Sequence, residues 1–224
     1  MGKTKSFIKN MYSNRDCKNF IPEEESWTAI VFGRIFAVPI ARLLAKLPIK
    51  INPNAITIFT MPFALLAAFF FFKNFLILGA VFFLISYIFD CVDGMYARLT
   101  NTSSEFGAKL DNYVDRINHF SMYLGLWYSQ YYLNDQWLIG GAIIFIHYLI
   151  MLFGKIFIKN QTYRTIISRV YSYYSSIDEG NYTFFILPLF GIFRELLPVL
   201  VALQAISYSV LYLKQKNKPN NKDN

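Results

Sequence analysis

The chain has 224 residues, of which 55% are hydrophobic, 19% are aromatic and only 16% are charged, and its mean hydropathy is +0.33. A soluble domain carries about 25% charged residues, so this composition argues against a compact aqueous protein and favours one whose apolar surface faces lipid. The net charge of +8 comes from basic residues at the two ends and in two loops between apolar segments, which is typical of contact with anionic membrane lipids and not of nucleic-acid binding.

The N-terminal region is polar before it becomes amphipathic. Residues 1–22 lack the apolar run of a cleavable signal peptide, and we expect a polar tail there. Over 23–50, apolar residues recur at helical spacing from Trp27 to Leu44, and Arg34 and Arg42 are interspersed. This pattern predicts an amphipathic helix in the membrane interface. A seventh membrane span is the alternative, and it would place both arginines at a costly depth.

Six apolar segments follow, and each is close to the roughly 20 residues that cross a ~30 Å hydrocarbon core. They lie at about 54–72, 76–97, 107–131, 136–157, 181–194 with some preceding residues, and 195–213. The fifth segment is short and contains Pro188 and Gly191. We therefore predict an all-α fold, an integral membrane bundle of six helices over 51–213. The interfacial helix precedes it, and a disordered basic tail over 214–224 follows.

Lysine and arginine residues gather on one side of these spans. That side receives the N-terminal tail, the turn at Arg98, a polar helix-like stretch over 158–178 and the C-terminal tail, whereas the other side receives only Lys73 and Arg194. Basic loops of membrane proteins stay in the cytoplasm. The sequence therefore predicts that both termini and the Arg98 turn face the cytoplasm.

Four carboxylates interrupt the apolar pattern where the second predicted span ends and the third begins. Asp90 and Asp93 are three residues apart, and Asp111 and Asp115 are four residues apart, so each pair shares a helix face. A helix hairpin brings the pairs together, where they repel one another unless a divalent cation such as Mg²⁺ or Mn²⁺ neutralises them. Because charges inside a membrane are costly, we predict a functional metal site. A cation pathway or interior salt bridges are the alternative.

The spacing of these residues also points to a family. The string D-x2-D-G-x2-A-R-x8-G-x3-D-x3-D runs without a gap from Asp90 to Asp115 and resembles the signature of the CDP-alcohol phosphotransferases. The six-span layout and the interfacial helix are similar to that family as well. The resemblance implies a homodimer that acts in phospholipid biosynthesis. It implies transfer of a substituted phosphate group, such as phosphatidyl, from a CDP-alcohol such as CDP-diacylglycerol to the hydroxyl of an acceptor alcohol, with release of CMP.

The resemblance also implies a role for each position of the signature. Asp90, Asp93 and Asp111 are implied to bind two Mg²⁺ or Mn²⁺ ions, and Asp115 to deprotonate the acceptor hydroxyl while touching a metal ion. The guanidinium of Arg98 suits a diphosphate, and glycines allow the nucleotide to approach the backbone. The residues implied to bind the CDP group are Gly94, Ala97, Arg98, Gly107, Asn54 and Thr57.

Several polar residues near the signature have more than one interpretation. Asn54 opens the first span, where it fits either a nucleotide contact or an ordinary helix start. His119 lies one helical turn beyond Asp115 and fits either an acceptor-binding residue or a hydrogen-bonded interior histidine. Arg116 fits either a contact to an acceptor phosphate or a helix-end charge. His147 stands alone in an apolar span and is interpreted as structural.

Two other classes of protein share part of this pattern. A membrane prenyltransferase that uses an isoprenyl diphosphate also binds Mg²⁺ through aspartates, but its two motifs lie in distant spans, whereas Asp93 and Asp111 are 18 residues apart. A cation-coupled transporter would show internal symmetry or scattered carboxylates, and the sequence shows neither. The sequence leaves the acceptor alcohol open, and also whether the CDP donor carries diacylglycerol or a smaller alcohol.

Overall fold

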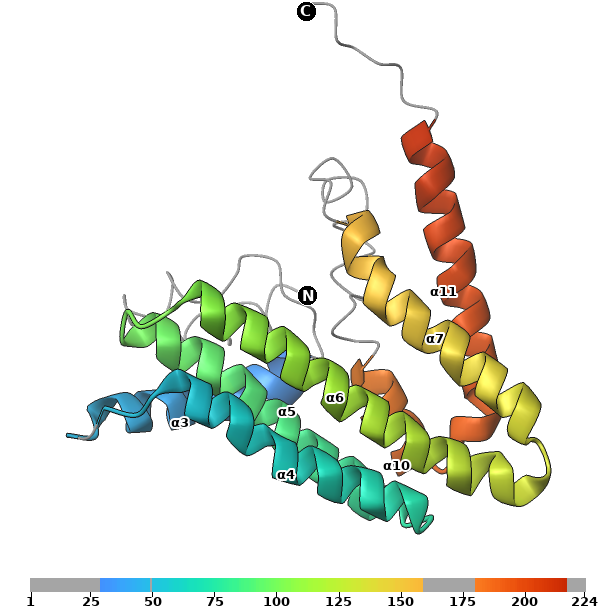
Figure 1. Cartoon of the computed structure of the whole chain (residues 1–224), viewed down its shortest axis with the longest axis horizontal. Coiled ribbons are helices and arrows are strands. Elements are labelled where there is room, and N and C mark those ends of the chain that lie inside the picture. The colour runs from blue at the N-terminus through green and yellow to red at the C-terminus, as the bar shows by residue number, and fades with distance from the viewer. Residues whose placement is uncertain (1–28, 49, 159–179, 217–224) are drawn as a thin grey trace, which may run out of the picture.

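The computed structural model describes residues 29–48, 50–158 and 180–216, and every regular element in these ranges is a helix (Figure 1). The all-α prediction is therefore confirmed for this part of the chain. The predicted N-terminal tail, nearly all of the polar stretch over 158–178 and the end of the C-terminal tail lie outside the described residues.

Three long helices, α4 (Pro53–Phe72), α5 (Leu76–Leu99) and α6 (Glu105–Gln130), lie side by side (Figure 1). They coincide with the first three predicted spans to within two residues at each end. Short turns join them, so successive helices run in opposite directions. The end of α5 therefore meets the start of α6 at the same end of the bundle as the start of α4.

Polar caps fix the first residues of α4 and α6. Asn52 accepts the backbone N–H of Asn54 at 3.0 Å, and Pro53 occupies the first helical position, where its missing N–H costs nothing. Ser104 accepts the backbone N–H of Gly107 at 3.0 Å in the same way. These two caps set the register of the helices that carry the predicted site residues.

The amphipathic region forms a π-helical turn, η1 (Ala29–Arg34), followed by α3 (Ile35–Lys46), and both pack against α5. The face of α3 that packs in the core carries three small apolar side chains: Ala37, Val38 and Ala41. Phe36 and Leu43 point outward and are 49% and 64% exposed. A helix with one face on the bundle and large apolar side chains outside it suits the membrane interface. Residues 23–28 of the predicted helix lie outside the described part.

The remaining helices form a second arm. After a short helix, η2 (Tyr132–Asn134), helix α7 (Trp137–Ile158) packs against α11 (Phe193–Lys216), and both lean away from α4 and α5 (Figure 1). They correspond to the fourth and sixth predicted spans, although α11 begins two residues earlier than predicted and continues to Lys216. Lysine and glutamine are good helix formers, which explains helix in the first residues of the predicted basic tail.

The fifth predicted span is described only in part, because the residues that precede Gly180 lie outside the described ranges. Within them it contains a π-helical turn, η3 (Tyr182–Ile186), and one short turn, α10 (Leu187–Leu189), and its helix ends five residues before the predicted end at 194. The chain then turns at Gly191, whose φ of +67° is a conformation that glycine adopts readily. Phe184 of η3 is fully buried and its ring lies 4.7 Å from that of Tyr123, which ties this segment to α6.

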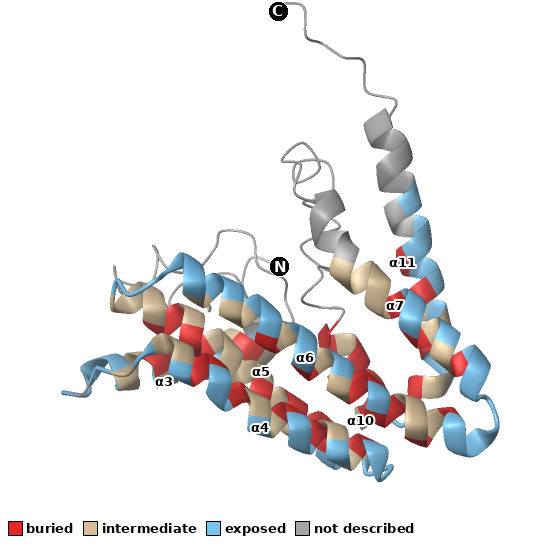
Figure 2. Ribbon diagram, viewed as in Figure 1, coloured by how far each residue is buried: buried red, intermediate tan, exposed pale blue. Residues whose placement is uncertain are grey.

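Many residues on the outside of the bundle are exposed (Figure 2), and large apolar side chains are prominent among them. On α4, Ile58, Phe59 and Phe69 are each about half exposed. Among the described residues, α4 and α5 are the two helices long and apolar enough to cross a membrane, with mean hydropathy of 2.2 and 2.0. Only 33% of each apolar window is buried inside the protein, so lipid is the natural environment for the rest. Six spans remain a prediction.

Candidate active site

Three carboxylates meet where α5 ends and α6 begins. Asp90 and Asp93 come from α5 and Asp111 comes from α6, and one oxygen of each lies within 4.8 Å of an oxygen of the other two. Asp93 is buried, and the other two are half-buried. The two helix faces predicted from the residue spacing are thus brought together in one hairpin.

A hydrogen-bond chain from α4 holds one of these carboxylates in place. The hydroxyl of Thr57 donates to Asp93 Oδ2 at 2.5 Å, and the hydroxyl of Thr60 donates to the Thr57 carbonyl at 2.7 Å. Because Thr60 has used its only O–H, its oxygen accepts from the side-chain amide of Asn118, at 3.3 Å. Outer partners of this kind orient metal ligands and tune their affinity.

The donor set fits a hard divalent cation. Oxygens bound to one Mg²⁺ ion lie at most about 4.2 Å apart, so oxygens within 4.8 Å of one another need only small side-chain rotations to share an ion. Lys109, two residues before Asp111, is paired with Glu105 at 2.6 Å on the exposed surface and not with the carboxylates. Three carboxylates without histidine or cysteine favour magnesium or manganese over zinc.

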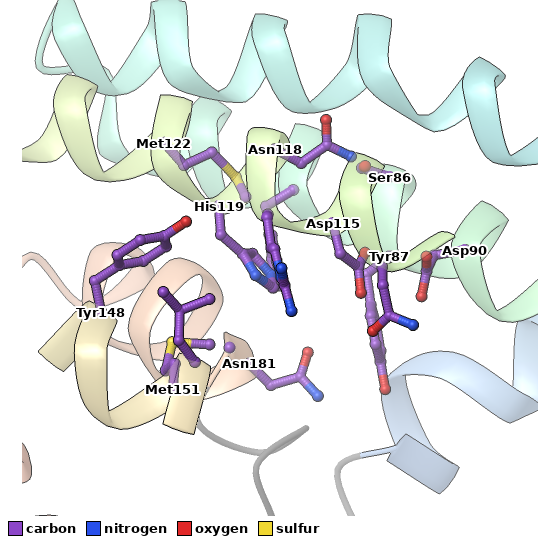
Figure 3. A pocket seen from close by; sticks show the side chains of 15 residues that line it. Ser86, Tyr87, Asp90, Asp115, Asn118, His119, Met122, Tyr148, Met151 and Asn181 are labelled. Carbon is purple, nitrogen blue, oxygen red and sulfur yellow. The ribbon is translucent and has the colours of Figure 1, made fainter. Parts of the chain in front are cut away.

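Asp115 lies beside this group and opens onto a cavity. Asp115 and Asp90 both line a cavity of about 140 Å³ (Figure 3). Figure 3 shows Asp90 and Asp115 at one end of the cavity and Met122, Tyr148 and Met151 at the other. The remaining lining residues are Phe83, Ser86, Tyr87, Asn112, Arg116, Asn118, His119, Leu152, Gly180 and Asn181. A small alcohol in this cavity can present a hydroxyl to Asp115.

Two of the residues predicted to bind CDP touch each other. A Cβ added to Gly107 would lie 3.0 Å from Asn54 Oδ1 and 3.1 Å from Ser104 Oγ, so these two side chains would have to shift by a few tenths of an ångström to admit it. The start of α6 therefore lies close to the Asn54 side chain at the start of α4. Asn54 is half-buried at this junction, close to the helix end that carries Asp111.

The other predicted CDP contacts lie on α5 and α4. The guanidinium of Arg98 folds back over Gly94, where a Cβ would lie 3.3 Å from Nη1. Ala97 is half-buried on the same turn. The side chain of Thr57 contacts Asp93, so its described role is to support a carboxylate. Contact of these four residues with a nucleotide stays a prediction.

The two residues predicted to contact the acceptor both line the cavity. Arg116 is exposed and His119 is half-buried. His147 does not line the cavity and is fully buried, and its Nδ1 lies 2.6 Å from the hydroxyl of Tyr123. This environment agrees with the structural interpretation of His147.

Sequence reasoning missed part of the cavity wall. Tyr87 lies three residues before Asp90, and Asn112 lies three residues before Asp115, so helical spacing from the carboxylates could have found both. Tyr148 comes from α7, and nothing in the sequence indicated that it would line the cavity.

The comparison with known proteins gives a family match and partial relatives. A family model described as CDP-alcohol phosphatidyltransferase matches residues 50–215. An archaetidylinositol phosphate synthase of Pyrococcus horikoshii is 34% identical over 87 residues, which cover 39% of this chain and 45% of that protein. An uncharacterized protein of Aquifex aeolicus is 37% identical over 84 residues, which cover 37% and 43%. The chain thus matches a little less than half the length of these curated relatives.

Solved structures resemble the chain over most of its length. A crystal structure of Mycobacterium tuberculosis phosphatidylinositol phosphate synthase with CDP-DAG bound gives a TM-score of 0.53 at 21% identity, and covers 86% of this chain and 98% of that one. The same protein in complex with manganese and citrate gives a TM-score of 0.54 at 19% identity, and covers 84% and 92%. At this level of identity the match shows a shared helical fold.

Proposed function

The chain belongs to the CDP-alcohol phosphatidyltransferase family, and from this we propose that it transfers a substituted phosphate group from a CDP-alcohol to an acceptor alcohol. The donor is most simply CDP-diacylglycerol, the transferred group is then phosphatidyl, and CMP is released. The observation that carries the proposal is the group formed by Asp90, Asp93 and Asp111 next to Asp115 at the polar end of a cavity. A cation site beside a base is well suited to the transfer of a phosphate group to an alcohol.

In the proposed reaction Asp115 accepts the proton of the acceptor hydroxyl. The hydroxyl oxygen forms a bond to the phosphorus that carries the lipid, the bond from that phosphorus to the bridging oxygen breaks, and CMP leaves with the electron pair. Asp90, Asp93 and Asp111 would hold two Mg²⁺ or Mn²⁺ ions, which neutralise charge on the diphosphate. Arg98 would bind the diphosphate through its guanidinium fork.

The cavity is the proposed binding site of the acceptor. Arg116, at its exposed rim, can form charge-assisted hydrogen bonds with a phosphate, and the polar end presents Asp115 to a hydroxyl. Two similar proteins are named as synthases of archaetidylinositol phosphate and phosphatidylinositol phosphate. Inositol 1-phosphate is therefore the first acceptor to test.

The proposed function is tested by CMP release from purified protein supplied with CDP-diacylglycerol and Mn²⁺. The acceptors are inositol 1-phosphate, glycerol 3-phosphate, serine and ethanolamine, each assayed separately. We expect CMP and a new lipid to form in equal amounts, only with both metal and one of the acceptors present. Consumption of isoprenyl diphosphate, or cation transport, without CMP release would instead support a prenyltransferase or a transporter.

We also propose that the chain is an integral membrane protein with six spans, and that both termini and the active site face the cytoplasm. Lys73 follows α4 and Ser103 follows α5, and both are exposed at opposite ends of α5. In a cysteine-free background, Ser103→Cys is expected to react with an impermeant thiol reagent from the cytoplasmic side, and Lys73→Cys from the other. Labelling of both from one side would exclude this topology.

A further inference from the structure

The inner part of the cavity is built around one imidazole. His119 lies one helical turn beyond Asp115 on α6, so both side chains face the same cavity, separated by a rise of about 6 Å along the helix. The ring of Phe184 stacks on the imidazole, with a centroid distance of 5.3 Å and an interplanar angle of 13°. Because Phe184 is fully buried in the core, it fixes the plane of the imidazole and so the direction of its nitrogens.

A glycine leaves space in front of this imidazole. Gly180 lies two residues before η3 and lines the same cavity. A Cβ at this position would lie 3.8 Å from His119 Nε2, and no other atom among the described residues would lie within 4 Å. A methyl group would therefore fit without strain. It would occupy the space that a ligand atom needs to hydrogen-bond Nε2.

The walls around this space set the kind of group that fits. Phe83, Met122 and Met151 give the cavity apolar walls, and the uncharged polar side chains of Asn118, Tyr148 and Asn181 line it beside them. A charged group loses much hydration in such surroundings, whereas an uncharged hydroxyl needs only one or two hydrogen bonds. An imidazole nitrogen can supply one of them as donor or acceptor.

We propose that His119, through the space that Gly180 leaves, binds a second, uncharged hydroxyl of the acceptor and so selects polyols over simpler alcohols. The inference rests on the proposed transfer to an alcohol with Asp115 as the base. Asp115 and His119 lie on successive turns of α6, about 6 Å of helix rise apart, so the acceptor must carry the second hydroxyl on a carbon well separated from the one that reacts. Hydroxyls on opposite sides of a six-membered ring meet this requirement.

The test compares wild type with Gly180→Ala, His119→Ala and the double variant, with inositol 1-phosphate as acceptor. Ser121→Ala is the matched control, because Ser121 lies on α6, bonds only the Ile117 carbonyl at 2.8 Å and does not line the cavity. Each single variant is expected to raise the acceptor KM about tenfold, the upper range for one lost hydrogen bond. The donor KM should stay within about twofold of wild type, and the double variant should behave like His119→Ala, because both changes remove the same contact.

A second measurement does not depend on turnover. Inositol 1-phosphate is expected to raise the unfolding temperature of donor-free wild type but not of Gly180→Ala. Unchanged acceptor KM and unchanged polyol stabilisation in Gly180→Ala would overturn the inference, as would a simple amino alcohol that outperforms every polyol. If wild type releases no CMP yet polyol binding is lost in Gly180→Ala, the proposed function fails while the binding site stands.

Discussion

Replacing Asp93 by Asn is expected to lower turnover at saturating CDP-diacylglycerol by about 10³-fold or more, and Asp90→Asn and Asp111→Asn should do the same. Each residue contributes an oxygen to the group whose oxygens lie within 4.8 Å of one another. A neutral amide does not replace an anionic ligand of a hard cation. Charge stabilisation of roughly 4 kcal/mol corresponds to this factor. The measurement is kcat as a function of Mn²⁺ concentration, with chelator-treated wild type as reference.

The same replacements are expected to leave the fold intact in the absence of metal. Removing one carboxylate from a close group relieves repulsion, so the unfolding temperature in chelator should be equal to or above that of wild type. Circular dichroism during heating checks this. Wild-type turnover with ordinary metal dependence in any of these variants would contradict the assignment of the metal site.

A variant that is expected to weaken metal binding without abolishing it tests how α4 supports this site. Thr57→Val removes the hydroxyl that donates to Asp93, and the Mn²⁺ concentration for half-maximal activity is expected to rise about tenfold. Thr60→Val is the comparison on the same helix and is expected to give a smaller rise, because its hydroxyl bonds the Thr57 carbonyl and Asn118 and does not contact a carboxylate directly. Equal shifts in the two variants would show that α4 acts only through packing.

The parts of the fold that could be predicted are those with local causes. The start of α4 at Pro53 and the hairpin that joins Asp93 to Asp111 follow from caps and from spacing within a few residues. Apolar length then sets the extent of the long helices. The signature is informative for the same reason, since its residues lie on two adjoining helix ends.

The parts that could not be predicted depend on contacts between distant residues. The bond from Thr57 to Asp93 joins positions 36 residues apart, and the sequence suggested a nucleotide contact for Thr57 instead. The stacking of Phe184 on His119 depends on a π-helical turn that no spacing rule indicates. The predicted end of the fifth segment at residue 194 is also wrong, because the turn at Gly191 ends the helix at Leu189.

Asp115→Asn is expected to retain donor binding and to lower kcat by about 10²-fold or more, the usual scale of general base catalysis. Asp115 lies beside Asp90 and lines the cavity, but it is not one of the three carboxylates whose oxygens lie within 4.8 Å of one another. Its carboxylate is therefore placed to receive a proton from an alcohol in the cavity. An asparagine keeps the shape but cannot accept that proton at neutral pH.

Arg98→Ala is expected to show the opposite pattern, with weaker donor binding as the main defect. The guanidinium lies over Gly94, one turn beyond Asp93 at the end of α5, where a diphosphate bound to the carboxylate-held cations would lie. Arg98→Lys should rescue binding only in part, because an ammonium lacks the two-pronged geometry of the guanidinium. Titration of a non-hydrolysable CDP-diacylglycerol analogue at fixed Mn²⁺ measures both variants on one scale. Should Asp115→Asn lose as much donor affinity as Arg98→Ala, Asp115 is primarily a metal ligand, and the proton acceptor must be another residue of the cavity.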